Sequence, residues 1–181
     1  MQNCEFNIYD GDERVRFSLG QDGSRKLFVI GLNPSTADAE KSDQTINKVK
    51  GFVKRQSKFD SFIMLNLCPL RSTNPNALPK LEDEELIRLA GRNGKAIKGI
   101  IEQENAPTIW AAWGNNIKKR PYLFGCLQTI VKIALNQKAD WITCGKMTKL
   151  GHPRHPSRLG YEIEFRLFDV KEYLRVFASL R

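Results

Sequence analysis

The feature that most constrains the fold is the alternation of short apolar runs with longer polar segments. Four runs have the composition of buried strands: KLFVIG (26–31), SFIMLNL (61–67), TIWAAWG (108–114) and DWITCG (140–145). Strands that alternate with helices pair in parallel, and the helices cover both faces of the sheet. We therefore predict an α/β protein, a three-layer α/β/α sandwich around a mostly parallel four-stranded sheet.

Helices are predicted in the longer segments, at residues 42–56, 81–104 and 120–135. Either Ser42 or Asp43 is expected to cap the first helix, because both side chains accept hydrogen bonds from orphan N–H groups. The first turn of the second helix is acidic, which its dipole favours. Pro121 suits the start of the third helix.

The two ends of the chain are expected to add further elements. Residues 4–9 and 14–20 flank DGDE, a turn signal, and predict an N-terminal hairpin. The segment YEIEFRLF (161–168) alternates apolar and polar residues and predicts a strand with one solvent-exposed face. Residues 169–180 are expected to close the chain as a helix.

Length and charge limit the classes of protein. A chain of 181 residues is expected to form a single domain, 1–181, with a substantial core. The net charge is +9, and residues 118–181 carry 13 basic and 5 acidic residues. Such a basic half favours a polyanionic partner such as nucleic acid or nucleotide, although a merely soluble basic surface explains the charge equally well.

No apolar run approaches the roughly 18 residues of a membrane span. Residues 1–10 also lack the basic start and apolar core of a signal peptide. We therefore expect a monomeric, cytoplasmic protein that does not associate with membranes.

Cysteine and histidine give no metal-binding pattern. The four cysteines are scattered, form no CxxC pair and are expected to be reduced and mostly buried: Cys4, Cys68, Cys126 and Cys144. A zinc site of Cys144, His152 and His155 would lack a fourth ligand. We expect neither a metal nor a cofactor.

Polar residues follow the predicted strands at the points where these strands end. Asn33 follows the first strand in GLNPS, Asn66 ends the second in MLN, and Trp113 with Gly114 ends the third. The loop GHPRHPSRLG (151–160), after the fourth strand, holds both histidines. Because the carboxyl ends of parallel strands form the ligand-binding edge of such sheets, we expect these groups to converge. Each could instead be a turn or core residue.

The ordered set GLNPS, MLN, AWG and HPSRL resembles the motifs of the uracil-DNA glycosylase superfamily. The GLNPS turn is most similar to its mismatch-specific branch, and HPSRL to its uracil-specific branch. The chain also resembles a bacterial and phage family of uncharacterised proteins, DUF1643, through GLNPSTADA, DQTI, NLCPLRST, AWGN and GHPRHPSRL. That second resemblance extends over nearly the whole chain.

The glycosylase resemblance implies hydrolysis of the bond between a base and its deoxyribose, without a cofactor. His155 would donate a hydrogen bond to the departing base, and Asn33 would position the attacking water. An amide has no useful basicity, so turnover would be slow. Asn66 would read uracil or a related pyrimidine, because its amide pairs one donor with one acceptor.

The resemblance assigns the remaining contacts to short segments. Gly31 and Leu32 would also contact the base. Leu159 would be the wedge that replaces the flipped base in the stack. Four further residues would contact phosphates or DNA: Ser35, Ser157, Arg154 and Arg158.

Two departures from the glycosylase pattern leave alternatives open. No aromatic residue closely follows Asn33 to stack on a base, since the next one is Phe52. Asp43 is either a helix cap or an alternative general base. The sequence therefore also fits a protein of this fold that binds a nucleotide, base or nucleic acid without cleavage, or one that hydrolyses a small nucleoside or nucleotide.

Overall fold

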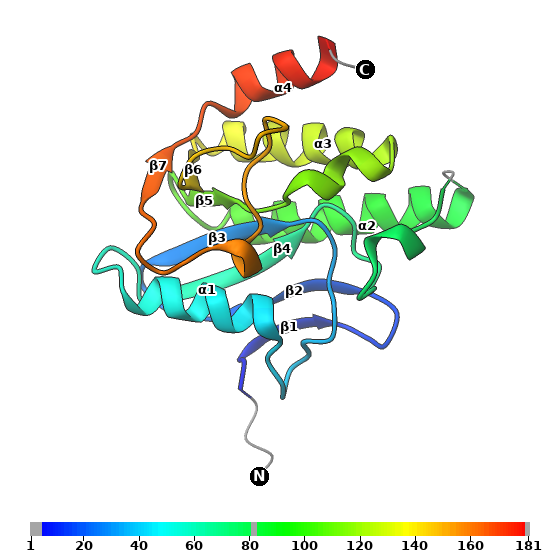
Figure 1. Cartoon of the computed structure of the whole chain (residues 1–181). Coiled ribbons are helices and arrows are strands. Elements are labelled where there is room, and N and C mark those ends of the chain that lie inside the picture. The colour runs from blue at the N-terminus through cyan, green and yellow to red at the C-terminus, as the bar shows by residue number, and fades with distance from the viewer. Residues whose placement is uncertain (1–4, 81–82, 180–181) are drawn as a thin grey trace.

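The computed structural model describes residues 5–80 and 83–179, and it contains a seven-stranded mixed sheet with four α-helices (Figure 1). The strands are β1 (Ile8–Gly11), β2 (Arg16–Gln21), β3 (Lys26–Gly31), β4 (Ser61–Asn66), β5 (Thr108–Ala111), β6 (Asp140–Cys144) and β7 (Phe165–Leu167). The helices are α1 (Gln44–Lys54), α2 (Glu84–Ile101), α3 (Tyr122–Asn136) and α4 (Val170–Ser179). Three short 3₁₀ helices are η1 (Pro75–Ala77), η2 (Asn115–Lys119) and η3 (Pro156–Arg158).

The centre of the sheet consists of four parallel strands in the order β4-β3-β5-β6. These are the four apolar runs of the sequence, and their burial on both faces explains why polar residues lie mostly at the strand ends. The parallel pairing places the carboxyl ends of all four strands at one edge.

The sheet is larger than predicted, because the terminal elements extend it at both sides. The N-terminal hairpin joins it through antiparallel pairing of β2 with β4, and β7 pairs antiparallel with β6. The predicted four-stranded sheet is therefore the central part of a seven-stranded one. Both additions cover edges that would otherwise expose unpaired backbone groups.

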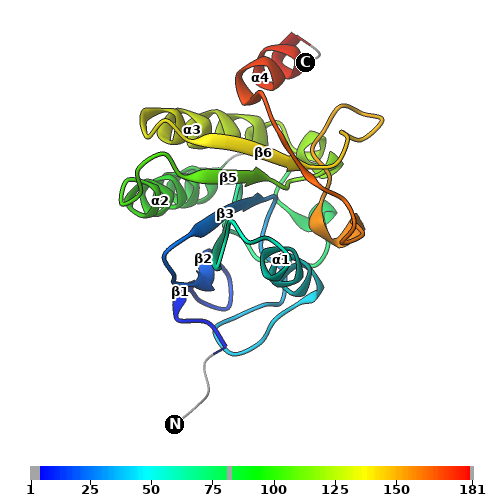
Figure 2. The same cartoon turned by 90° about the vertical axis from the view of Figure 1, so that its left-hand side faces the viewer.

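Helices cover both faces of the sheet, in three layers (Figures 1 and 2). One face packs against α1, with Val49 and Phe52 in that core. The other face packs against α2 and α3, and α4 adds Tyr173 and Phe177 to the same cluster. The start predicted for α2 at residues 81–82 lies outside the described residues, and the described helix begins after Asp83.

The C-terminal strand is much shorter than the predicted 161–168. Only Phe165–Leu167 pairs with the sheet. Tyr161 packs on α1, with its ring centroid 5.2 Å from that of Phe52 and 4.1 Å from the guanidinium carbon of Arg55. At Tyr161, contacts with α1 therefore replace the strand pairing that the alternating pattern of residues 161–168 predicted.

Candidate functional site

A cavity of about 730 Å³ lies at the carboxyl ends of the parallel strands. The loops after β3, β4, β5 and β6 all contribute to its wall, together with the first turn of α1. Ten residues singled out in the sequence line it: Leu32, Asn33, Ser35, Asp43, Trp113, Gly114, Arg154, His155, Ser157 and Arg158. The convergence follows from the parallel topology, which brings four loops distant in sequence to one edge.

The imidazole of His155 is held in one tautomer. The backbone N–H of Ser157 donates to Nδ1 at 3.4 Å, and the Ser157 hydroxyl lies 2.9 Å from the same nitrogen. Since Nδ1 accepts, the neutral ring carries its proton on Nε2. Burial lowers the pKa of His155, the carboxylate of Asp43 opposes this, and Arg158 adds to the lowering. The ring is therefore neutral at pH 7 and provides a donor.

Gly114 allows this placement of the imidazole. It has φ of +69°, a conformation that glycine adopts without strain. A Cβ atom built on Gly114 would lie 3.2 Å from the Cβ of His155. The loop after β5 can therefore pass close to the histidine because it carries no side chain there.

The amide of Asn33 connects two loops of the cavity wall. Its Nδ2 donates to the carbonyl oxygens of Pro34 and Ser72, both at 2.9 Å, and reaches that of Leu70 at 3.5 Å. These bonds determine which end of the amide is nitrogen. The oxygen Oδ1 is the end left to accept a hydrogen bond from a ligand or water.

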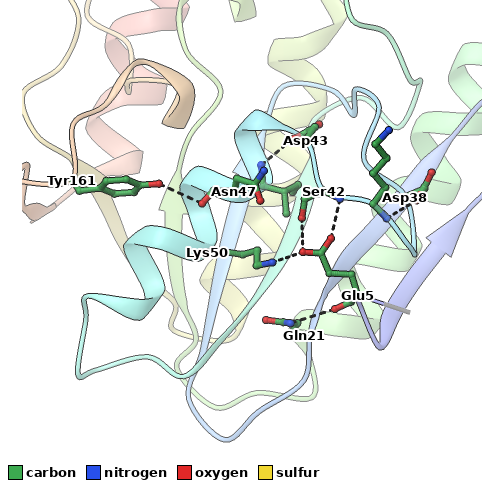
Figure 3. A network of polar contacts seen from close by, with 10 residues as sticks. Glu5, Gln21, Asp38, Ser42, Asp43, Asn47, Lys50 and Tyr161 are labelled. Atoms are coloured by element: carbon green, nitrogen blue, oxygen red, sulfur yellow. Dashed lines mark hydrogen bonds and ion pairs between the residues drawn. The ribbon is translucent and has the colours of Figure 1, made fainter. Parts of the chain in front are cut away.

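Asp43 is the N-cap of α1 and also lines the cavity. Its Oδ1 accepts from the backbone N–H of Ile46 at 2.9 Å (Figure 3). The same carboxylate opposes the lowering of the pKa that burial causes in Arg16 and His155, and all three residues line the cavity. The capping interpretation and a role in the cavity are therefore compatible.

The loop before α1 is fastened to the N-terminal segment (Figure 3). Glu5 accepts from the hydroxyl of Ser42 at 2.7 Å and from its backbone N–H at 3.0 Å. Lys50 of α1 forms an ion pair with the same carboxylate. This network connects the residue before the Asp43 cap, and α1 itself, to the N-terminal segment.

Asn66 does not line the cavity. It ends β4 beside Gly31 of β3 and is 0% exposed, and neither polar atom of its side chain has a hydrogen-bond partner within the described chain. A Cβ atom on Gly31 would lie 2.8 Å from Oδ1 of Asn66 and 2.5 Å from Cε of Met64. The pairing of β3 with β4 thus buries Gly31 and Asn66, and neither is among the described lining residues, whereas Met64 is.

Leu159 is not presented as a wedge. It is 3% exposed and packs in the cluster beneath α1, and its carbonyl oxygen accepts from Nζ of Lys48 at 2.8 Å. The end of the HPSRL segment turns inward onto α1, which provides the apolar surface that a leucine favours.

Basic side chains line the cavity at its opening to solvent, where Lys149 and Arg158 are exposed. Arg154, Arg158 and Lys149 line the cavity, and Arg154 also donates to the carbonyl oxygen of Lys146 at 2.9 Å. Asp43 is the single carboxylate residue among the described lining residues. The cavity therefore favours ligands with negative charge.

His152 has a different environment from His155. It is 2% exposed, and its Nδ1 lies 2.9 Å from the hydroxyl of Tyr173. Nε1 of Trp113 donates to the same hydroxyl at 3.1 Å, so the Tyr173 hydroxyl connects the indole to the imidazole of His152. This chain of hydrogen bonds ties the loop to α4, whereas His155 faces the cavity.

Sequence reasoning missed Arg16, which lines the cavity from β2. No local motif distinguishes it, since RVRFSLG looks like an ordinary strand with polar residues toward solvent. A charged residue on a strand that pairs with the central sheet would have indicated a role for Arg16. The pairing of β2 with β4, however, is known only from the structure.

Cys68 and Cys144 are free and buried, and Cys126 is half-buried. Residues 5–80 and 83–179 contain no group of three or more His, Cys, Asp or Glu that could hold a metal. Within the same residues, no helix combines the length and the apolar character that a membrane span requires.

Comparisons with known proteins identify a family. Neither the curated proteins nor the solved structures contain a significant match to the chain. One family profile, described as "Protein of unknown function (DUF1643)", matches residues 16–157, a range that includes β2 through the HPS loop and nearly all of the cavity wall. The chain therefore belongs to the DUF1643 family.

Proposed function

We propose that this protein is a DNA base glycosylase, which hydrolyses the N-glycosidic bond of uracil or a related damaged or modified pyrimidine. One observation carries the proposal: a neutral histidine with its N–H donor available and a carboxylate share one cavity at the carboxyl edge of a parallel sheet. The order of the GLNPS, MLN, AWG and HPSRL motifs, similar to that of uracil-DNA glycosylases, also supports it.

His155 would stabilise the departing base. As the glycosidic bond breaks, negative charge develops on the oxygens of a pyrimidine, and a preorganised donor stabilises this charge most in the transition state. Nε2–H of His155 would supply that donor, while Ser157 holds the ring through Nδ1. Because its pKa is lowered, the imidazole is neutral, and its Nε2–H would donate a hydrogen bond to the departing base without transferring the proton.

Asn33 and Asp43 would act on the sugar side. The amide orientation of Asn33 leaves Oδ1 to accept a hydrogen bond from the attacking water. The carboxylate of Asp43 would stabilise positive charge on the sugar and accept the proton of the water, which an amide cannot do. The basic residues at the opening, Arg154, Arg158 and Lys149, would contact the phosphates of DNA.

A second candidate function is binding of a nucleotide or nucleic acid without cleavage. Two observations favour it: the Asn33 nitrogen is already used to hold the loop after β4, and one oxygen of Asp43 is used to cap α1. Asn66, the predicted reader of the base, is buried outside the cavity. A protein with these features could hold its ligand firmly and lack a group that activates water.

The experiment that separates the two functions is base release from single-stranded oligonucleotides. Substrates carry uracil, hydroxymethyluracil or hypoxanthine, and alkali cleaves the strand wherever a base has been lost. We expect His155→Ala to lower the rate about 10²–10³-fold, as for other lost transition-state donors. Circular dichroism verifies folding of each variant.

His152→Ala is the matched control, because it removes the other histidine of the same loop but no donor in the cavity. We expect a much smaller loss of rate, accompanied by lower stability. A folded His155→Ala variant as active as the wild type would exclude the catalytic role. Absence of base release by the wild type from every substrate would leave binding as the function, and affinities of the same two variants would then be compared.

A further inference from the structure

Arg16 is a buried cation at the wall of the cavity. Its side chain is 2% exposed, and Nη1 donates to the carbonyl oxygen of Ala37 at 2.9 Å. Its Nε is buried without a hydrogen-bond partner, and none of the ion pairs within residues 5–80 and 83–179 includes Arg16. A guanidinium has five N–H donors, so most of its donor capacity faces no protein acceptor.

A buried and incompletely paired guanidinium lowers the stability of the folded state. A buried charge loses its hydration, and only close pairing with further hydrogen bonds compensates for that loss. Burial lowers the pKa of Arg16 to about 10, while Asp43 and Asp38 oppose the shift and Arg71 adds to it. The side chain therefore stays charged at neutral pH and lacks a carboxylate in contact. Groups of this kind are concentrated at binding sites, where a ligand completes them.

The position of Arg16 indicates which part of a ligand it meets. Because Arg16 is 2% exposed and lines the cavity, a ligand reaches its guanidinium from within the cavity. An internal phosphodiester would have to continue in two directions from this buried group, whereas a terminal anionic group ends there. The first turn of α1 also lines the cavity through Thr45 and Ile46, and the positive end of its dipole favours an anion.

The charge of the whole cavity favours a phosphate. Four lining residues are cationic, Arg16, Lys149, Arg154 and Arg158, against the single acidic residue Asp43. A phosphate monoester carries close to two negative charges at pH 7 and offers several acceptor oxygens to a guanidinium. A volume of about 730 Å³ lies within the range of pockets that enclose small molecules, so a whole nucleotide unit can enter.

We propose that Arg16 binds the terminal phosphate monoester of a nucleotide held in the cavity. The inference rests on the proposed function in so far as the cavity holds a nucleotide unit, and it names the part of that unit that is recognised. The phosphate belongs either to a free nucleoside monophosphate or to the 5′-phosphorylated end of a DNA strand.

The first test uses the wild-type protein and calorimetric titration. The probes are deoxyuridine, deoxyuridine 5′-monophosphate and inorganic phosphate. We expect the monophosphate to bind about 10–100-fold more tightly than the nucleoside, the usual effect of charge-assisted hydrogen bonds. Inorganic phosphate should compete with it. Equal affinities for nucleoside and monophosphate would overturn the proposal, without any need for a variant.

The second test uses Arg16→Met, which keeps the length of the stem and removes the charge. The preference for the monophosphate should disappear, while stability should stay near that of the wild type, because an incompletely paired buried charge is also removed. Arg25→Met is the matched control: Arg25 pairs with Asp60 just before β3, at the opposite ends of the strands. An undiminished preference in folded Arg16→Met would overturn the proposal. If Arg16→Met does not fold, the preference for the monophosphate is measured in Arg16→Lys, and the wild-type titrations test the proposal independently of any variant.

Two further arms identify the source of the phosphate and separate this inference from the proposed function. Oligonucleotides with a 5′-phosphate or a 5′-hydroxyl are compared with the free monophosphate for competition. Phosphate-dependent binding without base release from any substrate supports the inference and argues against glycosylase activity. Base release with equal competition by deoxyuridine and its monophosphate supports the activity and overturns the inference.

Discussion

Asp43 combines two requirements that differ in their chemistry. Capping α1 needs an oxygen that accepts from the N–H of Ile46, and an amide oxygen meets this need as well as a carboxylate. The influence on Arg16 and His155 needs a negative charge. The substitution Asp43→Asn therefore separates the two roles, because it keeps an oxygen that caps α1 and removes the negative charge.

We predict that Asp43→Asn lowers base release by about 10²-fold, the lower range for loss of a general base. The free energy of unfolding should fall by less than about 1 kcal/mol, since the cap remains and only the interaction of the charge with the helix dipole is lost. Asp83→Asn is the control, because Asp83 caps α2 in the same way and does not line the cavity. An unchanged rate of base release by Asp43→Asn would show that Asp43 serves only as the cap of α1.

At the scale of elements, the loop between β6 and β7 depends on α4 for its position. His152 and Trp113 both bond to the hydroxyl of Tyr173, and the rings of Tyr173 and Phe177 pack at 5.7 Å. The His152 ring also packs against Phe177, at 5.1 Å between centroids. The helix thus holds the loop that carries His155, although it does not line the cavity itself.

Tyr173→Phe tests this connection. The change leaves Nε1 of Trp113 and Nδ1 of His152 buried without a partner, which should cost about 1–3 kcal/mol per group left unpaired. Urea unfolding measures the loss. Tyr161→Phe is the matched control, because the hydroxyl of Tyr161 makes one long contact of 3.5 Å at the surface. Equal stabilities of the two variants would show that the buried hydroxyl contributes nothing.

For the whole molecule, the uneven charge predicts how binding responds to salt. The excess of basic residues lies in 118–181, and Lys149, Arg154 and Arg158 bring part of it to the cavity opening. DNA binding should weaken steeply between about 50 and 200 mM salt, because phosphate contacts release counterions. Fluorescence anisotropy with a labelled oligonucleotide measures the slope. A flat response would exclude phosphate contacts as the source of affinity.

The two histidines predict how stability depends on pH. Burial lowers the pKa of both His152 and His155 below 6.5, so the unfolded chain binds more protons than the folded one as pH falls through 6.5. The free energy of unfolding should therefore decrease from pH 7.5 to pH 5.5. Carboxylates with lowered pKa values, such as Glu5, contribute only below this window. Urea titrations should show a smaller slope for His152→Gln combined with His155→Gln; an equal slope would contradict the assignment.

The sequence by itself determined the class of fold and the edge at which the site lies. Strand and helix patterns are local, and the caps Asp43 and Asp83 are recognisable within four residues of their partners. Parallel pairing then follows from the order of the elements, which is why Asn33 and His155 were expected at one edge and both line the cavity there.

Only the tertiary structure decided which polar groups enter the cavity and which lie behind its wall. Asn66 and Asn33 both lie at the ends of apolar strands, yet Asn66 is paired beside Gly31 and fully buried, whereas Asn33 lies two residues beyond β3 and lines the cavity. Arg16 reaches the cavity because β2 pairs with β4, a contact between segments more than forty residues apart in the sequence. The burial of a residue and the pairing of its charge depend on many contacts with residues distant in the sequence. A local sequence pattern therefore cannot predict them.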